Sequence, residues 1–339
     1  MKNSTRQVYN GYLSQIAQLN GVDDATAKFN VTPTIQQKLE TKMQESSAFL
    51  SSINVVIVDE MSGAKLGMGI GGPVSSNTDT SGAGERATSD PTSLTEQLYQ
   101  CRKNNFDTHI KYSKLDQWAK FKDFQTRMRD VIIKRQALDR ITVGFNGTSY
   151  AATSDIATYP MLQDVNIGWL QKYRDDAPAR VMSEVVPASG TITVKAGGDY
   201  ENLDALVMDA VSNLVAPWYA EDTDLVAIMG RDLLADKYFP LVNTAQPPTE
   251  KMAADIIISQ KRVGGLQAVR VPFVPAGTIL ITKLDNLSIY IQESSRRRHI
   301  VENAKRDQIE NYESSNDDYV IEDYECGCLI ENIDTTPAP

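Results

Sequence analysis

The sequence predicts an α+β fold in which a long hairpin, a long amphipathic helix and a mixed α/β unit follow one another. More than half of residues 62–93 are Gly, Ser or Thr, and strand-like runs flank this tract. Apolar residues recur every three or four positions between Leu115 and Ile141, the spacing of an amphipathic helix. From Leu203 onwards, helical and strand-like patterns alternate. Together these observations favour a mixed architecture.

Two short helices are expected at the N-terminus. The first spans residues 8–19 at helical spacing and stops at Asn20-Gly21. Thr32-Pro33 supplies an N-cap and a first-turn proline for the second helix, which carries Ile35 and Leu39. Neither helix has enough apolar surface to stand alone, so we expect them to form an arm.

The tract at residues 62–93 is expected to be part of a long hairpin. Ile53–Val58 is rich in β-branched residues, and Phe106–Tyr112 alternates apolar and polar positions, so both are predicted strands. A connection of this length without structure of its own is uncommon inside a compact domain. We therefore expect a hairpin that reaches away from its own subunit and needs a partner surface.

The longest predicted helix begins near Ser113 and ends around Gly144 or Asn146-Gly147. Ser113–Asp116 resembles a capping box, with Asp at the third position. The expected apolar stripe consists of Leu115, Trp118, Phe121, Phe124, Met128, Val131 or Ile132, Leu138 and Ile141. At 1.5 Å per residue this helix is a rod of ~40 Å, long enough to support other elements.

Shorter elements are expected in the rest of the chain. Helices are predicted within Val165–Tyr173 and at Leu203–Leu214, Arg231–Tyr238 and Lys251–Ile258, and strands at Thr191–Val194, Leu225–Met229, Val269–Val271 and Thr278–Ile281. Near the C-terminus Leu287, Ile289 and Ile291 should share one strand face, and Tyr324, Cys326, Cys328 and Ile330 another.

Composition narrows the classes of function. The formal net charge is −10 and the sequence pI about 4.9, which argues against a dedicated binder of nucleic acid or membrane surfaces. The start lacks the apolar core of a signal peptide, and no apolar run has the length of a membrane span. Three cysteines cannot build a disulfide framework, so we expect a soluble protein made in a reducing compartment.

Catalytic motifs are scarce. Gly67–Gly72 superficially resembles a dinucleotide loop, but no helix is predicted after it, and a flexible hairpin is the preferred interpretation. Of the two histidines, His109 is expected on the exposed face of a strand. No G-x-S-x-G elbow or P-loop occurs. No catalytic residue or cofactor is predicted.

Metal and charge clusters also have simpler interpretations. Cys326 and Cys328 lack two further zinc ligands, and Asp222-Thr223-Asp224 is expected to be an acidic turn before a strand. The carboxylates Glu310, Glu313, Asp317, Asp318, Glu322, Asp323 and Glu325 are expected on a solvated or subunit-contacting face. The basic patch Arg296–His299 is expected to be solvated or to pair with a neighbouring subunit, with nucleic-acid contact as the weaker alternative.

Several long segments resemble the major capsid proteins of P2-like tailed phages (peduoviruses), which have the HK97-like shell plan. The similar segments are Met43–Ser47, Leu115–Ala119, Val131–Gln136, Asp164–Met182, Leu233–Pro240, Ser259–Arg262 and Glu310–Ser314. The order of arm, hairpin, rod, α/β unit and closing strands is similar as well. The likeness extends over nearly the whole chain.

The resemblance implies a division of the chain into functional parts. Its domains would be 1–29, removed on maturation; 30–52, the N-arm; 53–112, the extended loop and its base strands; 113–202, the peripheral domain with its spine helix; 203–285, the axial domain; and 286–339, the closing strands and tail. The processing site would be Phe29-Asn30. The inter-subunit loop would include Lys65, Gly69, Gly71, Gly72 and Arg86.

The resemblance further implies a shell subunit of the virion, assembled in the bacterial cytoplasm into hexamers and pentamers. Its partners would be copies of itself, the internal scaffold with the prohead protease, and the portal protein. The shell would enclose double-stranded DNA without sequence-specific binding, and no membrane is involved. Two alternatives stay open: the shell of a non-viral nanocompartment on the same fold, and an enzyme in the α/β unit.

Overall fold

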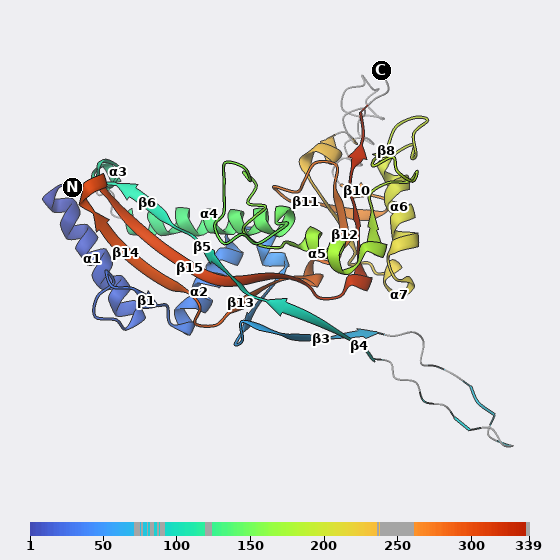
Figure 1. Ribbon diagram of the computed structural model, residues 1–339, viewed down its shortest axis with the longest axis horizontal. Coiled ribbons are helices and arrows are strands. Elements are labelled where there is room, and N and C mark those ends of the chain that lie inside the picture. Colours follow the sequence, from blue (N-terminus) through green and yellow to red (C-terminus); the bar gives the residue numbers. More distant parts are fainter. Residues whose placement is uncertain are drawn as a thin grey trace, which may run out of the picture.

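Two β-sheets, linked by helices, form the body of the computed structural model, and a β-hairpin projects from it (Figure 1). The structure describes residues 1–70, 92–118, 124–235 and 261–336, together with residues 75, 77–79, 81, 85, 86, 88 and 237.

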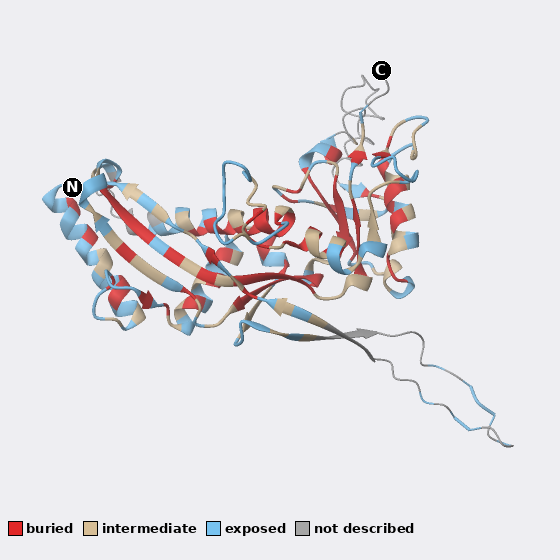
Figure 2. Cartoon of the chain, viewed as in Figure 1, coloured by how far each residue is buried: buried red, intermediate tan, exposed pale blue. Residues whose placement is uncertain are grey.

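The larger sheet has seven strands. Its order is β1 (Phe29–Asn30), β14 (Arg297–Asn303), β15 (Gln308–Ile321), β13 (Leu287–Gln292) and β2 (Asn54–Val58), with β5 (Arg102–Asn105) and β6 (Thr108–Lys111) also paired to β15. The 14-residue strand β15 is the axis of this sheet, because β14, β13, β5 and β6 all pair with it. Buried residues therefore run along most of β15 and β13 (Figure 2).

Helices from the N-terminal half pack on this sheet. They are α1 (Asn3–Asn20), α2 (Pro33–Glu45), α3 (Tyr112–Trp118), α4 (Phe124–Asn146) and α5 (Trp169–Asp176). Short 3-10 helices lie at Leu50–Ser52, Pro178–Arg180, Leu284–Asn286, Ala304–Arg306 and Tyr324–Cys326. At 1.5 Å per residue α4 alone is about 35 Å long, so it extends along much of the sheet.

The main core is built around Trp169, which is fully buried. Its ring makes edge-on contacts with Phe145 at 5.4 Å and with Tyr319 at 5.3 Å between centroids. Its indole Nε1 donates a hydrogen bond to the Ser288 carbonyl oxygen at 3.1 Å. Such edge-to-face packing stabilises a core beyond the area that it buries. Trp169 thereby joins α4, α5, β13 and β15.

The smaller sheet has six strands, and both of its faces pack against apolar cores. Its order is β10 (Arg262–Val263), β11 (Leu266–Arg270), β9 (Val226–Met229), β12 (Ile279–Thr282), β16 (Cys328–Ile330) and β7 (Val181–Met182). In β9, Val226 and Ile228 belong to the main core, whereas Ala227 and Met229 pack with α6 (Leu203–Leu214) in a second core. Strands buried on both faces read as continuous apolar runs, as β9 and β12 do.

A short helix and two pairs of strands complete the described part of the structure. The short helix α7 (Pro217–Ala220) follows α6, and β8 (Ile192–Thr193) pairs with β17 (Ile333–Asp334). The hairpin consists of β3 (Ser62–Ile70) and β4 (Thr92–Gln100), which pair antiparallel from Ser62↔Gln100 to Ile70↔Thr92. It leaves the body near the middle of the larger sheet and points away from it (Figure 1).

Most predicted elements are confirmed. The first helix ends at Gly21, which adopts the left-handed conformation, and α6 spans the predicted residues. Pro33 begins α2, although the Thr32 side chain makes no capping hydrogen bond. The predicted strands near 226–229, 266–271, 279–282 and 287–292 are also present.

The prediction was wrong about which strands form the hairpin. Ile53–Val58 and Phe106–Tyr112 do form strands, but β2 pairs with β13 and β6 pairs with β15. The hairpin strands come instead from residues 62–70 and 92–100. A two-stranded ribbon needs no buried face, so its sequence carries little of the alternation that marks a core strand.

The predicted rod helix also needs correction. Tyr112 already lies in α3, so Ser113 is not its N-cap. Val131 is 61% exposed, and the buried positions of α4 include Ile133, Ala137 and Ile141. Residues 119–123 and the side chains of Trp118, Phe121, Phe124 and Met128 lie outside the described part, so a continuous rod stays a prediction.

Three predictions for short elements were confirmed only in part. The helix expected within Val165–Tyr173 begins only at Trp169, because Gly168 is extended. Tyr324 and Cys326 lie in a 3-10 helix, so only Cys328 and Ile330 share a strand face. The helix expected at Arg231–Tyr238 is present over residues 231–235, whereas Lys251–Ile258 lies outside the described residues.

Replacing Gly144 by alanine should destabilise the subunit. A Cβ atom at Gly144 would lie 2.2 Å from the Trp169 ring, so the core must shift. We expect the free energy of unfolding to fall by about 1–3 kcal/mol, the usual effect of overpacking. Denaturant titration measures it. The matched control is Gly11→Ala in α1, where nothing lies within 4 Å and a gain of up to ~1 kcal/mol is expected. Equal effects at both sites would contradict the packing argument.

Candidate functional site: the hairpin base, the N-terminal segment and a buried charge cluster

The hairpin is fastened to its own body by Lys65. Its side chain is 9% exposed, and Nζ forms an ion pair with the Glu322 carboxylate at 2.9 Å. Nζ also donates to the carbonyl oxygens of Ile321, at 3.0 Å, and Glu322. The Glu322 carboxylate accepts from Ser288 Oγ at 2.5 Å and from the Tyr290 hydroxyl at 3.2 Å. Lys65 therefore fixes the hairpin base to the end of β15.

The other residues predicted for the inter-subunit loop are only partly described. Gly69 lies in β3 opposite Ser93, and Arg86 is exposed. Gly71 and Gly72 lie outside the described residues. Near the base Leu98 is 80% exposed in β4, so an apolar side chain of the hairpin has no cover within the described part of its own chain.

The predicted processing site lies in a strand. Phe29 and Asn30 form β1, opposite Arg298 and Arg297 of β14, and the Phe29 side chain is 7% exposed. The next amide, of Val31, donates to the Arg296 carbonyl oxygen at 2.9 Å. The bond between Phe29 and Asn30 is therefore held at the edge of the larger sheet.

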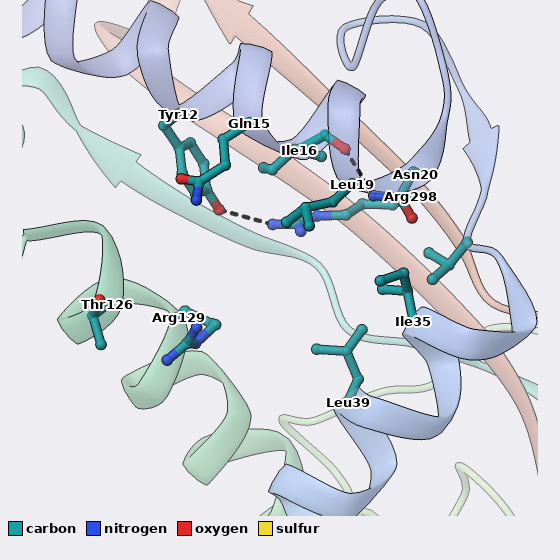
Figure 3. A pocket seen from close by; sticks show the side chains of 11 residues that line it. Tyr12, Gln15, Ile16, Leu19, Asn20, Ile35, Leu39, Thr126, Arg129 and Arg298 are labelled. Atoms are coloured by element: carbon teal, nitrogen blue, oxygen red, sulfur yellow. Dashed lines mark hydrogen bonds between the residues drawn. The ribbon is translucent and has the colours of Figure 1, made fainter.

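Helix α1 is attached to the same sheet by polar contacts. Arg6 donates to both oxygens of Glu302, at 2.8 and 3.1 Å, and Arg298 donates to the Tyr12 hydroxyl at 3.1 Å. A groove of about 250 Å³ lies between α1, α2 and α4, with Ile35 and Leu39 of α2 along one side and Arg129 of α4 facing them (Figure 3). The N-terminal helix thus covers part of the sheet but leaves a gap beside α4.

A cluster of buried charges joins α2, α4, β15 and the start of β14. Arg140 forms ion pairs with Glu40 and with Asp317, the latter at 3.3 Å. Arg296 pairs with the other oxygen of Glu40 at 2.9 Å and with Glu313 at 2.7 Å. All five side chains are less than 7% exposed.

Gln136 completes this cluster. Its amide nitrogen donates to Glu313 at 3.0 Å, and its oxygen accepts from Arg296 at 2.9 Å. Burial alone would raise the pKa of Glu313, but the charges of Arg296 and Arg298 and two hydrogen bonds lower it to about 2. Because this pKa lies below the usual 4.5, Glu313 stabilises the fold above that pH and loses its effect as the pH falls towards 2.

The predictions for these charges were wrong. We expected Arg296 to be solvated or to pair with another subunit, yet it is 1% exposed and paired within its own chain. Glu310, Glu313, Asp317 and Asp318 were expected on a solvated or contacting face, yet all are buried. The burial of Arg140 and Glu40 was not predicted, because isolated charged residues on helices usually lie on the surface. The position of Arg140 between the apolar Ala137 and Ile141 was the available signal.

Among the described residues, the cysteines, His109 and Asp222 are not arranged for catalysis. Burial raises the pKa of Cys326 to about 11 and that of Cys328 to about 12, so both thiols stay protonated and unreactive. Asp222 pairs with Lys283 at 3.2 Å, and His109 is exposed as predicted. Among the described residues, no group of three or more His, Cys, Asp or Glu side chains is placed to hold a metal ion. No described helix is long and apolar enough to cross a membrane.

Comparison with known proteins gives the family. The family model of phage major capsid proteins of the P2 family matches residues 8–333. The chain belongs to this family. It is 56% identical to the capsid protein of Escherichia phage P2 over 340 residues, covering 98% of this chain and 95% of that protein. It is 42% identical to the major capsid protein of Serratia phage KSP20, covering 98% and 97%.

The fold agrees with this assignment. A solved subunit from the procapsid of satellite phage P4, which includes a size determination protein, superposes with a TM-score of 0.83. It is 54% identical, and 99% of each chain is covered. The predicted α+β, HK97-like capsid fold is confirmed. The protein is thus a structural component, the major capsid protein that forms the icosahedral shell of a tailed phage, and not an enzyme. Nothing in the comparisons supports the nanocompartment or enzyme alternatives.

Truncating Glu40 should destabilise the subunit strongly. Glu40→Ala leaves Arg296 and Arg140 with one carboxylate each in a buried site. Breaking a buried ion pair from one side typically costs about 3–5 kcal/mol. The matched control is Asp130→Ala, which removes an exposed pair with Arg129 and should cost less than ~1 kcal/mol. Denaturant unfolding of both variants measures the difference. A loss at Glu40 as small as that at Asp130 would contradict the role assigned to the cluster.

Proposed function

We propose that the shell is built from hexameric and pentameric capsomers in which the β3/β4 hairpin lies on a neighbouring subunit. The observation that carries this proposal is the hairpin itself. It is anchored through Lys65 at its base, points away from the body and exposes Leu98. A ribbon of two strands is marginally stable alone, so it gains most from a surface to lie on.

The parts of the chain would divide the work as follows. Residues 30–52 form an N-arm, 53–112 the extended loop with its base strands, 113–202 the peripheral domain with the spine helix α4, 203–285 the axial domain, and 286–339 the closing strands and tail. The second core around α6 supports a division of this kind, and the main core around Trp169 joins the two parts, because Val226, Ile228 and Leu280 also pack in it. Strands β7 and β16 join the smaller sheet from outside residues 203–285.

Assembly would involve other phage proteins. We propose the internal scaffold with its prohead protease and the portal protein as partners, with assembly in the host cytoplasm. The shell would enclose double-stranded DNA without recognising its sequence. A net charge of −10 supports weak contact with the phosphate backbone rather than a tight grip.

The N-terminal residues 1–29 would be removed during maturation. In support, α1 and the segment after it cover one end of the larger sheet, where Tyr9, Ile16 and Phe29 pack against Ile300 and Ile309 in a cluster separate from the main core. Because Phe29 is buried in β1, the bond must leave the sheet edge before a protease can bind it in extended form. Processing would therefore depend on local opening of β1.

Shortening the hairpin should block assembly without unfolding the subunit. Ile70 and Thr92 are paired, so residues 71–91 can be replaced by Asn-Gly, a dipeptide suited to a two-residue turn. Co-expressed with the scaffold, this variant should retain the thermal midpoint of the unchanged chain yet give no closed shells in electron micrographs. Closed shells of normal yield would show that residues 71–91 are dispensable for assembly.

Mature shells should contain a chain that begins at Asn30. Mass spectrometry of shells formed with the prohead protease should show loss of residues 1–29. Phe29→Ala removes a buried side chain from β1 and should loosen this edge, so it tests whether opening limits the rate. If opening is limiting, processing accelerates; Gln18→Ala, an exposed position of α1 away from the bond, serves as control. A full-length chain in mature shells would contradict the proposed site.

A further inference from the structure

Three basic side chains gather on one face of the larger sheet. They are Lys28, Lys103 and Arg297, and Arg102, whose side chain alternates with that of Lys103 in β5, lies at the rim of the same surface. They line two adjoining cavities of about 560 Å³ and 250 Å³, and Lys103, Arg297 and Ser314 belong to both. We call this surface the basic face.

The strand geometry turns this face away from the helices. Arg296 contacts Glu40 of α2 and Gln136 of α4, and Arg298 contacts Tyr12 of α1. Successive side chains of a strand point to opposite faces, so Arg297 points the other way. Its cross-strand neighbour Ser314 is small and polar, and the next strand contributes the exposed Asn105.

The charges of the basic face are unsatisfied within the described part of the chain. None of its three cations forms an ion pair there; the neighbouring Arg102 donates to Gln100 Oε1 at 3.4 Å and lies 5.2 Å from the centre of the Tyr150 ring. The larger cavity has no carboxylate in its lining. The smaller has Asp107 and Glu313; Glu313 is buried and paired with Arg296, and Asp107 accepts from the Glu313 amide at 3.2 Å. An acidic chain thus carries a local excess of positive charge.

The hairpin offers the complementary charge. Residues 62–100 contain four acidic and two basic residues, and one of these two, Lys65, is already bound to Glu322. Asp79 and Glu85, beyond the ends of β3 and β4, are exposed and form no ion pair with any described cation.

We infer that the basic face of one subunit is the docking surface for the acidic hairpin of a second copy of this chain. Ion pairs from Arg297 and Lys103 to the hairpin carboxylates would hold the hairpin in register. This inference rests on the proposed assembly through the hairpin and adds the receiving surface. Complementary charge across an interface mainly selects the partner and the register, which suits a shell of identical subunits. A nucleic-acid phosphate backbone is the other polyanion that this face would meet, but Asp107 lies among its cations and the chain as a whole is acidic.

A charge-swap experiment tests this inference. Arg297→Glu with Lys103→Glu reverses the basic face, and Asp79→Lys with Glu85→Lys reverses the hairpin. Each double variant of the full chain, co-expressed with the scaffold, should lower the yield of closed shells by about tenfold or more, because like charges repel across the interface. Combining all four substitutions should restore most of the yield. Sedimentation and electron microscopy measure the yield.

Controls separate the possible causes of failure. Lys114→Glu with Lys134→Glu reverses two exposed cations on α3 and α4 and should leave the yield unchanged. Equal thermal midpoints of the unassembled subunits show that folding is intact. No rescue in the fourfold variant would overturn the inference. So would normal shells from the basic-face variant that contain less DNA, since they would assign this face to nucleic acid. Absence of shells from the unchanged chain would instead contradict the proposed assembly itself.

Discussion

The buried ion cluster around Glu40 is the interaction on which the arrangement of the larger sheet depends. Glu40 lies in α2, Arg140 in α4, Arg296 just before β14, and Glu313 and Asp317 in β15. Charges in a protein interior are tolerated only when each has close partners of opposite sign. The cluster therefore admits one relative placement of two helices and two strands. A small shift would leave at least one charge without its partner.

This constraint explains how a subunit with projecting parts keeps a defined shape. The helices α2 and α4 are tied to the sheet by charges, while α5 and α4 are tied to it by the aromatic contacts of Trp169. Apolar packing alone allows many similar arrangements, whereas paired charges favour a single register. The hairpin and the N-terminal helix can then be presented to neighbouring subunits from a rigid frame. A shell of identical copies needs such a frame, because small errors in shape add up around a closed surface.

Much of the fold was predictable from local patterns, and the exceptions have physical causes. Leu203–Leu214 and Val226–Met229 have apolar patterns that match their burial, so α6 and β9 were found close to their true bounds. The hairpin strands were missed because no core selects their side chains. The partner of Lys65 lies 257 residues further along the chain, and no local pattern reports such a contact. The assignment of Phe29-Asn30 came from family resemblance alone, because nothing in the residues themselves marks a cleavage site.

The attachment of Lys65 has a mechanical consequence. Lys65 Nζ donates hydrogen bonds to the backbone carbonyl oxygens of Ile321 and Glu322, where β15 of the larger sheet ends. Only a few residues later, after the turn held by Asn286 and Asp323, the chain enters β16 of the smaller sheet. The base of the hairpin is thus attached where the larger sheet and the smaller sheet of the subunit meet. A rotation of one half of the subunit against the other would therefore also change the direction in which the hairpin projects.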